Sequence, residues 1–134
     1  MKKSNSPIIL GIDPGYDRVG WAVGIFSNSK FKVINLGCIQ TNNKENIFSR
    51  YAQISAELQR IARNYSPKVL AIETLFFAKN KKTALRVSEA RGVIISTLLN
   101  ENLEVDEYSP NAIKLAVTGS GAADKRAVEK MVKM

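Results

Sequence analysis

Residues 8–26 read IILGIDPGYDRVGWAVGIF, in which a run of branched apolar residues ends on a single acid, Asp13. The apolar run is typical of a buried strand. A buried charge costs several kcal/mol unless it is paired, hydrogen-bonded or bound to a metal. We therefore expect Asp13 at the end of the strand, facing a cation. Asp13 taken alone could equally be a turn cap, because aspartate often serves as one.

The residues that follow Asp13 predict a β-hairpin and then a third strand. Pro14-Gly15 and Gly20 mark a turn, after which apolar residues alternate again from Trp21 to Ile25. A similar alternation covers residues 30–41, KFKVINLGCIQT. The chain thus opens with three strands in a meander.

Periodicity in the rest of the chain predicts helices that alternate with strands. The expected elements are a helix from Ile47 to about Asn64, a strand Val69–Glu73, a helix Thr83–Leu99, a strand Glu104–Tyr108, a helix from Pro110 to Thr118, and a last helix after a glycine-bearing loop. The element order βββαβαβα predicts an α/β fold with a mixed five-stranded sheet flanked by helices.

The composition limits the possible partners and chemistries. At 134 residues the chain forms one domain, residues 1–134, and Lys plus Arg number 20 against 12 Asp plus Glu, a net charge of +8. This balance favours a polyanion, with nucleic acid ahead of an anionic membrane surface. No apolar run is long enough to span a bilayer and no signal peptide is recognisable, so we expect a cytoplasmic protein without a membrane partner.

The chain contains no histidine and a single cysteine, Cys38. The first absence excludes Ser-His and Cys-His triads, as well as His-ligated metals. The second excludes an internal disulfide and a cysteine-rich zinc site, and we expect Cys38 to be a small core residue. If the protein is an enzyme, its tools are carboxylates, lysines and hard metal ions.

Two lone acids, Asp13 and Glu73, end predicted strands that a right-handed crossover would place side by side. Carboxylates that converge in this way repel each other, and a divalent ion between them relieves the repulsion through hard oxygen ligands. This is half of a two-metal phosphodiesterase site, which needs no protein nucleophile.

Three further stretches suggest contacts. In TLFFAKNKKT, residues 74–83, exposed aromatics beside lysines suit base stacking and phosphate contacts, although one of the two phenylalanines is expected to fold inward. The loop and helix start in 119–134 suit a phosphate, or form an ordinary basic turn. The apolar stripe of the helix 83–99 is too broad for one buried face, and small Ser88, Ala90 and Gly92 make this helix a candidate dimer contact.

The segments ILGIDPGYDRVGWAVG, AIETLFFAKNKKTALRVSEARGV and EYSPNAIKLAVTGSGAADKRAVEKMV together resemble the motifs of the RuvC family of Holliday-junction resolvases over nearly the whole chain. The resemblance implies a ribonuclease H-like fold and a homodimer that binds four-way junction DNA, and the helix Thr83–Leu99 is the candidate contact of this homodimer. It also implies Mg²⁺-dependent symmetrical nicking in recombination and repair, with Mn²⁺ as a substitute. RuvA and RuvB are the implied branch-migration partners.

The resemblance also implies roles for individual residues. Asp13 and Glu73 match the metal-binding catalytic acids, and Phe76 matches an aromatic residue that stacks on a base near the crossover. The other matched positions are DNA-facing or lie near the scissile phosphate, namely Lys79, Asn80, Lys114 and Lys125.

One departure from the family pattern concerns the end of the chain. The family completes its metal site with Asp-x-x-Asp at the start of a last helix, beyond the region that matches Val128 to Met134. We therefore expect a domain truncated at its C-terminal end that is weak or inactive as a nuclease, whereas the complete protein would be a resolvase.

Three other interpretations remain. The Gly-Ile-Asp-x-Gly pattern also opens the actin, Hsp70 and sugar-kinase superfamily, but those proteins need two such domains. A resolvase-like nuclease acting on RNA shares the first strand, although Glu73 and FFAKN point away from it. A non-catalytic junction-binding module is the third alternative, because the chain lacks the last two aspartates.

Overall fold

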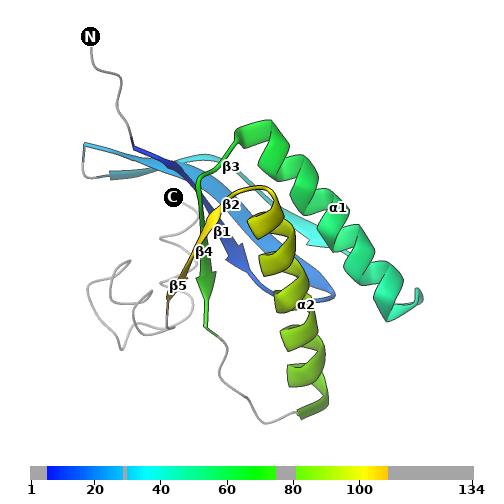
Figure 1. The fold of residues 1–134 in the computed structure, drawn as a ribbon. Coiled ribbons are helices and arrows are strands. Elements are labelled where there is room, and N and C mark those ends of the chain that lie inside the picture. Colours follow the sequence, from blue (N-terminus) through cyan, green and yellow to red (C-terminus); the bar gives the residue numbers. More distant parts are fainter. Residues whose placement is uncertain (1–5, 29, 75–80, 109–134) are drawn as a thin grey trace.

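The computed structural model describes residues 6–28, 30–74 and 81–108 (Figure 1). Within these ranges it contains β1 (Ile8–Asp13), β2 (Arg18–Ser27), β3 (Lys30–Gln40), α1 (Ile47–Tyr65), β4 (Val69–Glu73), α2 (Lys81–Asn100) and β5 (Glu104–Tyr108). Each strand and helix predicted within these ranges is confirmed, with ends that differ by two residues at most outside β2. The helices predicted beyond Pro110 lie outside the described residues.

The strands form one mixed sheet in the order β3-β2-β1-β4-β5. The first three strands are the predicted antiparallel meander, and β1 then pairs in parallel with β4, which pairs in parallel with β5. Helix α1 connects β3, at one edge of the sheet, to β4, which pairs with β1. The two strands that end in lone acids therefore lie next to each other. This is the mixed five-stranded α/β sheet expected of a ribonuclease H-like fold.

Both described helices lie side by side on one face of the sheet (Figure 1). Alternate residues of the central strands face these helices and are buried, whereas the residues between them face the other way. The side chains with no exposed surface in the resulting core include Leu10, Val19, Val23, Ile54, Leu58, Leu70, Ile94 and Leu98. The helix-covered face of the sheet therefore holds the hydrophobic core of the described part.

Helix α1 has defined caps at both ends. The side chain of Asn46 accepts hydrogen bonds from the backbone N–H groups of Phe48 and Ser49, at 2.7 and 3.4 Å, which is the usual role of an N-cap. Ser66 ends the helix in the left-handed region, with φ of 49°, before Pro67. In the described part of the chain, neither helix is long and apolar enough to cross a membrane.

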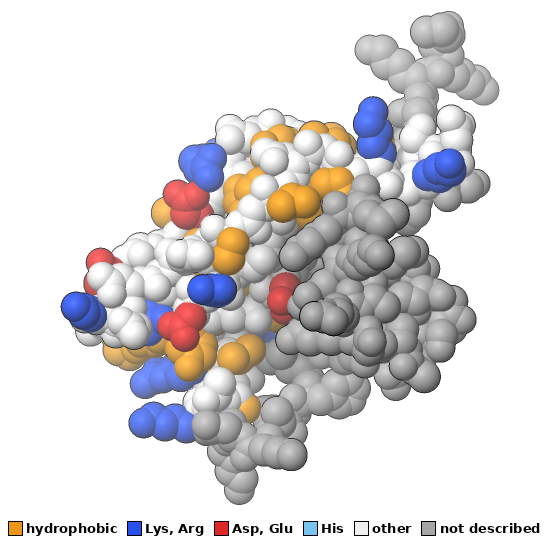
Figure 2. All heavy atoms as spheres, turned by 180° about the vertical axis from the view of Figure 1, so that it is seen from behind, with side chains coloured by type: hydrophobic (Ala, Val, Ile, Leu, Met, Phe, Trp, Pro, Cys, Tyr) orange, Lys and Arg blue, Asp and Glu red, His pale blue; other side chains and the backbone are white. Residues whose placement is uncertain are grey.

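The expectation for Cys38 is wrong, because Cys38 is exposed. Strand β3 lies at the edge of the sheet, and its alternation places Ile39 under the helices while Leu36 and Cys38 face the opposite side. Leu36 accordingly keeps 49% of its surface exposed. Figure 2 shows hydrophobic side chains exposed on the side of the molecule away from the viewer of Figure 1.

The expectation for Ala90 is also wrong in one respect. Its side chain has no exposed surface and belongs to the buried face of α2, so it is not available to a second molecule. Gly92, by contrast, is exposed, and an added Cβ there would meet nothing within 4 Å. The small-residue stripe thus divides between the core and the surface.

Candidate functional site

Asp13 and Glu73 are the last residues of two neighbouring parallel strands, β1 and β4. The register pairs Ile12 with Ile72, so the two acids follow directly on paired positions at the same edge of the sheet. Adjacent strands lie about 4.8 Å apart. The predicted convergence of the two acid-bearing strand ends is therefore confirmed.

The two acidic side chains also lie on the same face of the sheet. Ile12 and Ile72 are buried under the helices, and since successive side chains alternate, Asp13 and Glu73 face away from α1 and α2. Asp13 is exposed and Glu73 is half-buried. Both carboxylates are thus placed where water or a ligand can reach the edge of the sheet.

Gly20 leaves space beside Asp13. The two residues are paired between β1 and β2, and a Cβ added at Gly20 would lie 3.6 Å from the Cβ of Asp13. Any larger side chain at this position would fill the volume next to the carboxylate. A side chain at this position would therefore contact Asp13 from the β2 side.

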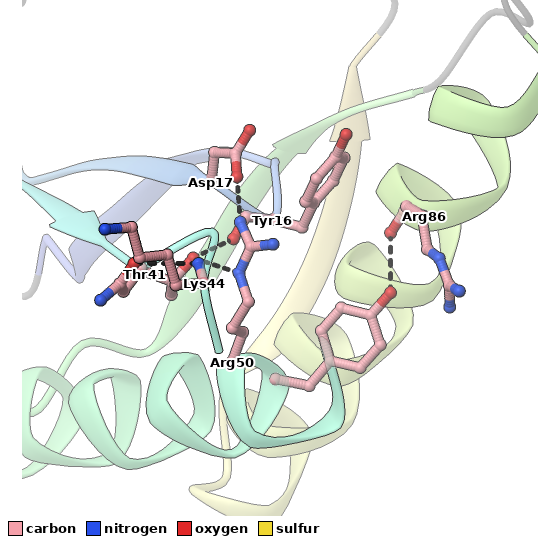
Figure 3. Close-up of polar contacts among 8 residues, drawn as sticks. Tyr16, Asp17, Thr41, Lys44, Arg50 and Arg86 are labelled. Atoms are coloured by element: carbon pink, nitrogen blue, oxygen red, sulfur yellow. Dashed lines mark hydrogen bonds and ion pairs between the residues drawn. The ribbon is translucent and has the colours of Figure 1, made fainter. Parts of the chain in front are cut away.

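The turn after Asp13 is held in place by a buried arginine of α1, Arg50, which is only 6% exposed. Its guanidinium forms an ion pair with Asp17, and its Nε donates to Thr41 Oγ1 at 3.0 Å (Figure 3). The same guanidinium lies over the ring of Tyr16, 5.3 Å from its centroid. One side chain thus contacts the β1–β2 turn and the start of the β3–α1 connection.

Thr41 connects the same two loops directly. Its backbone N–H donates to the carbonyl of Asp17 at 3.0 Å, and its hydroxyl donates to the carbonyl of Tyr16 at 2.5 Å. Gly15 allows the turn to close, because a Cβ there would lie 2.3 Å from the carbonyl oxygen of Arg18. The chain that follows Asp13 is therefore fixed by hydrogen bonds, a buried cation and a glycine-dependent turn.

A second arginine, Arg91 of α2, holds the other acid-bearing strand end. Its Nε donates to the main-chain carbonyl of Glu73 at 3.3 Å, and its terminal nitrogen forms an ion pair with Glu107 of β5. The side chain of Arg91 is 16% exposed. Thr74, directly after Glu73, donates its backbone N–H to the carbonyl of Tyr108 at 2.8 Å.

The carboxylates of Asp13 and Glu73 suit a hard divalent cation, because carboxylate oxygens are the ligands that Mg²⁺ prefers. Within residues 6–28, 30–74 and 81–108, no three acidic or other metal-binding side chains cluster together. The described part therefore offers a two-carboxylate site.

The remaining residues that the sequence singled out as DNA contacts lie outside the described residues: Phe76, Lys79, Asn80, Lys114 and Lys125. Two residues beside the site were not predicted, Arg50 and Arg91. Arg50 continues the buried side of α1, one helical turn before Ile54, and Arg91 adjoins the buried Ala90, but neither position in the sequence indicates by itself a contact with the site.

A groove of about 620 Å³ runs between α1 and α2 on their outer side. Its walls combine aromatic, polar and small residues, namely Phe48, Tyr51, Ser55, Gln59, Glu89, Gly92, Val93, Ser96, Thr97 and Asn100. Phe48 is 66% exposed at one end of this groove. Tyr51 donates its hydroxyl to Glu89 at 3.2 Å, and burial raises the pKa of this phenol.

Residues 9–134 match the family model described as crossover junction endodeoxyribonuclease RuvC. A protein of that name from Brachyspira hyodysenteriae is 44% identical over 127 residues, which cover 95% of this chain and 79% of the relative. Another, from Caldicellulosiruptor saccharolyticus, is 46% identical over 126 residues and covers 93% and 76%.

Solved structures show the same arrangement. Thermus thermophilus RuvC in complex with a Holliday junction substrate superposes with a TM-score of 0.88 at 26% identity, over 95% of this chain and 78% of that one. The yeast mitochondrial Holliday junction resolvase Ydc2 has a TM-score of 0.67 at 16% identity, over 93% and 62%, and shares the fold.

Proposed function

The chain belongs to the RuvC family of crossover junction endodeoxyribonucleases, and on this premise we propose that it binds four-way DNA junctions and nicks them symmetrically by hydrolysis of phosphodiester bonds. The observation that carries the proposal is the pair of acids, Asp13 and Glu73, at adjacent parallel strand ends on one face of the sheet. The net charge of +8 agrees with a polyanionic substrate.

We propose that Asp13 and Glu73 hold Mg²⁺, with Mn²⁺ as a substitute. A bound divalent ion supplies a water activated at neutral pH and stabilises charge on the phosphate and the leaving oxygen. The protein's own part is to hold two carboxylates at fixed positions. The Arg50 network secures the turn after Asp13, and Arg91 secures the backbone of Glu73.

We further propose that the substrate is distorted and oriented by residues outside the described ranges. Phe76 would stack on a base near the crossover, with Lys79 and Asn80 in the same loop. Lys114 and Lys125 would hold the scissile phosphate and stabilise its developing charge. Phe76→Ala is expected to weaken junction distortion, seen by fluorescence energy transfer between labelled arms, and unchanged transfer would contradict the stacking role.

The experiment that tests the activity uses a labelled four-way junction and a linear duplex of the same sequence. Each is incubated with excess wild-type chain, with Asp13→Asn or with Glu73→Gln, in EDTA, Mg²⁺ or Mn²⁺. We expect junction binding in EDTA from all three proteins, because the amides lose charge but little volume. Nicks require the metal and both carboxylates.

Different outcomes separate the alternatives. Junction binding without nicking in either metal, both by this chain and by a version extended through the family's Asp-x-x-Asp segment, would favour a non-catalytic junction-binding module. Nicking of a structured RNA in preference to the DNA junction would favour the RNA-directed alternative. If Asp13→Asn abolishes junction binding together with the folded circular dichroism spectrum, Asp13 is structural and the assignment is wrong.

We also propose a homodimer formed through α2, with its partner seated at the groove between α1 and α2. The groove combines an exposed aromatic, Phe48, with the exposed Gly92 that lets another backbone approach closely. A dimer would present two nuclease sites, as symmetrical nicking of a four-way junction requires. RuvA and RuvB are the proposed partners of the nuclease in branch migration.

A further inference from the structure

Arg91 contacts two strands at once, close to one of the two acids. Its Nε donates to the carbonyl of Glu73, the last residue of β4, and its terminal nitrogen pairs with Glu107 of β5. This guanidinium thus reaches the backbone of a proposed metal ligand. A planar, always-charged fork is suited to such simultaneous contacts, which a lysine ammonium cannot reproduce in the same geometry.

The faces of the sheet explain how Arg91 reaches Glu73 from the helix side. Val105 packs against the core under the helices, and Glu107, two residues later, points to the same side and meets Arg91 of α2. The side chain of Glu73 points to the opposite face. Arg91 therefore contacts the main chain of Glu73 from the helix-covered face of the sheet. The Glu73 carboxylate lies on the opposite face, where the proposed cation site is.

The position of this contact matters because it lies where the β-ladder ends. The hydrogen bond from the Thr74 N–H to the Tyr108 carbonyl, 2.8 Å, closes the β4–β5 pairing just past Glu73. Strand ends fray more readily than strand interiors. Arg91, which contacts Glu73 of β4 through a hydrogen bond and Glu107 of β5 through an ion pair, would oppose this fraying at the residue proposed to hold a metal.

We propose that Arg91 is a positioning residue for the proposed metal site: through the Glu73 carbonyl and Glu107 it fixes the end of β4, and thereby the Glu73 carboxylate, against α2. The proposal deepens the proposed function and rests on it. Groups that orient a metal ligand without touching the ion typically change metal affinity when they are removed, whereas an ion pair that only stabilises the fold does not.

The test uses Arg91→Ala, Arg91→Lys and Glu107→Gln in the full chain. The matched control is Arg63→Ala, since Arg63 also joins two elements through an ion pair, with Glu101 at 3.0 Å, but at the C-terminal end of α1. The measurements are Mn²⁺ binding by calorimetry and hydrogen exchange of the Thr74 amide by NMR. Urea unfolding of each variant reports global stability.

We expect Arg91→Ala to weaken Mn²⁺ binding by about 10-fold or more and to speed exchange at Thr74 while amides in the centre of β1 keep their protection. Arg91→Lys should keep the pair with Glu107 but not the bond to Glu73, so it should recover only part of the affinity. Glu107→Gln should fall between wild type and Arg91→Ala. Arg63→Ala should leave both measurements at wild-type values.

The proposal is overturned if Arg91→Ala matches the control in Thr74 exchange, or if exchange rises uniformly across the sheet in proportion to lost stability. Exchange at Thr74 does not require metal or nicking. If the wild type binds no Mn²⁺ and Asp13→Asn changes nothing, the proposed metal site fails, while a local effect of Arg91→Ala at Thr74 still supports anchoring of the β4 end.

Discussion

Gly15 and Gly20 lie on either side of the turn after Asp13 and differ in what a methyl group would meet. At Gly15 a Cβ would lie 2.3 Å from a backbone oxygen, whereas at Gly20 it would lie 3.6 Å from the Cβ of Asp13. We expect Gly15→Ala to lower the free energy of unfolding by about 1–3 kcal/mol through overpacking. Gly20→Ala should leave it unchanged or raise it by about 0.5 kcal/mol. Urea titrations of both variants check this.

Larger side chains at Gly20 test whether the cation uses the space next to Asp13. Gly20→Val should fold, because β-branched residues suit strands, but its side chain would occupy the space beside Asp13. We expect weaker Mn²⁺ binding from Gly20→Val than from Gly20→Ala. Equal binding by both variants would show that the cation does not use this side of Asp13.

The sequence predicted the positions of the two acids better than the burial of other residues in the sheet. A lone acid that ends an apolar run is visible in the sequence, and both Asp13 and Glu73 lie at strand ends as expected. Alternation alone does not say which face of a strand is covered, so Cys38 was assigned to the core although it is exposed. The metal and DNA roles of the predicted residues stay predictions.

The element that secures the proposed metal site on the β1 side is α1, through Arg50. This guanidinium is nearly buried while its partner Asp17 has 60% of its side chain exposed, so solvent screens part of the attraction. We expect Arg50→Ala to cost about 2–3 kcal/mol, chiefly from lost packing and the bond to Thr41. Urea unfolding measures it, with Arg60→Ala, from an exposed pair in the same helix, expected within about 0.5 kcal/mol of wild type.

A double-mutant cycle separates packing from charge in this network. Asp17→Asn should cost less than Arg50→Ala, because the arginine keeps Thr41 and the ring of Tyr16 as neighbours. The coupling energy between Arg50 and Asp17 should be about 1 kcal/mol. Additive effects within error would mean that the ion pair contributes nothing to the stability of the turn.

Helical periodicity explains why α1 was predicted and Arg50 was not. The apolar positions that repeat through Ile54, Leu58 and Ile61 define the buried side of the helix. Arg50 continues this side toward the N-terminus, but a cation is normally assigned to solvent. Its burial depends on Asp17 and Thr41, which are distant in sequence, so only the tertiary structure reveals it.

At the scale of the whole molecule, the sheet order follows from few local features. The hairpin from β1 to β2 and the parallel pairing of β1 with β4 place Asp13 and Glu73 together, and both features were predicted. The chain covers 75–79% of the relatives from Treponema denticola and Brachyspira hyodysenteriae. That the family's Asp-x-x-Asp segment completes the site stays a prediction, tested by comparing nicking with and without that segment.

If the proposed dimer forms through α2, a large side chain in place of the exposed Gly92 should prevent the subunits from associating. Gly92→Arg should fold, because Gly92 has open space around it and arginine is a better helix former than glycine. We expect this variant to sediment as a monomer at concentrations where the wild type is dimeric. Ala56→Arg on α1, exposed but outside the groove, should remain dimeric. A dimeric Gly92→Arg would place the interface elsewhere.

The salt dependence of DNA binding distinguishes electrostatic attraction to any DNA from recognition of the shape of a junction. Each phosphate contact releases counterions, so the logarithm of the binding constant should fall linearly with the logarithm of salt concentration for both the junction and the linear duplex. The net charge of +8 predicts a steep slope for each substrate. The preference for the junction should persist across this range, because branch geometry adds contacts that a linear duplex cannot supply. Fluorescence anisotropy titrations at several salt concentrations measure both quantities, and a preference that vanishes as salt rises would mean that charge alone selects the substrate.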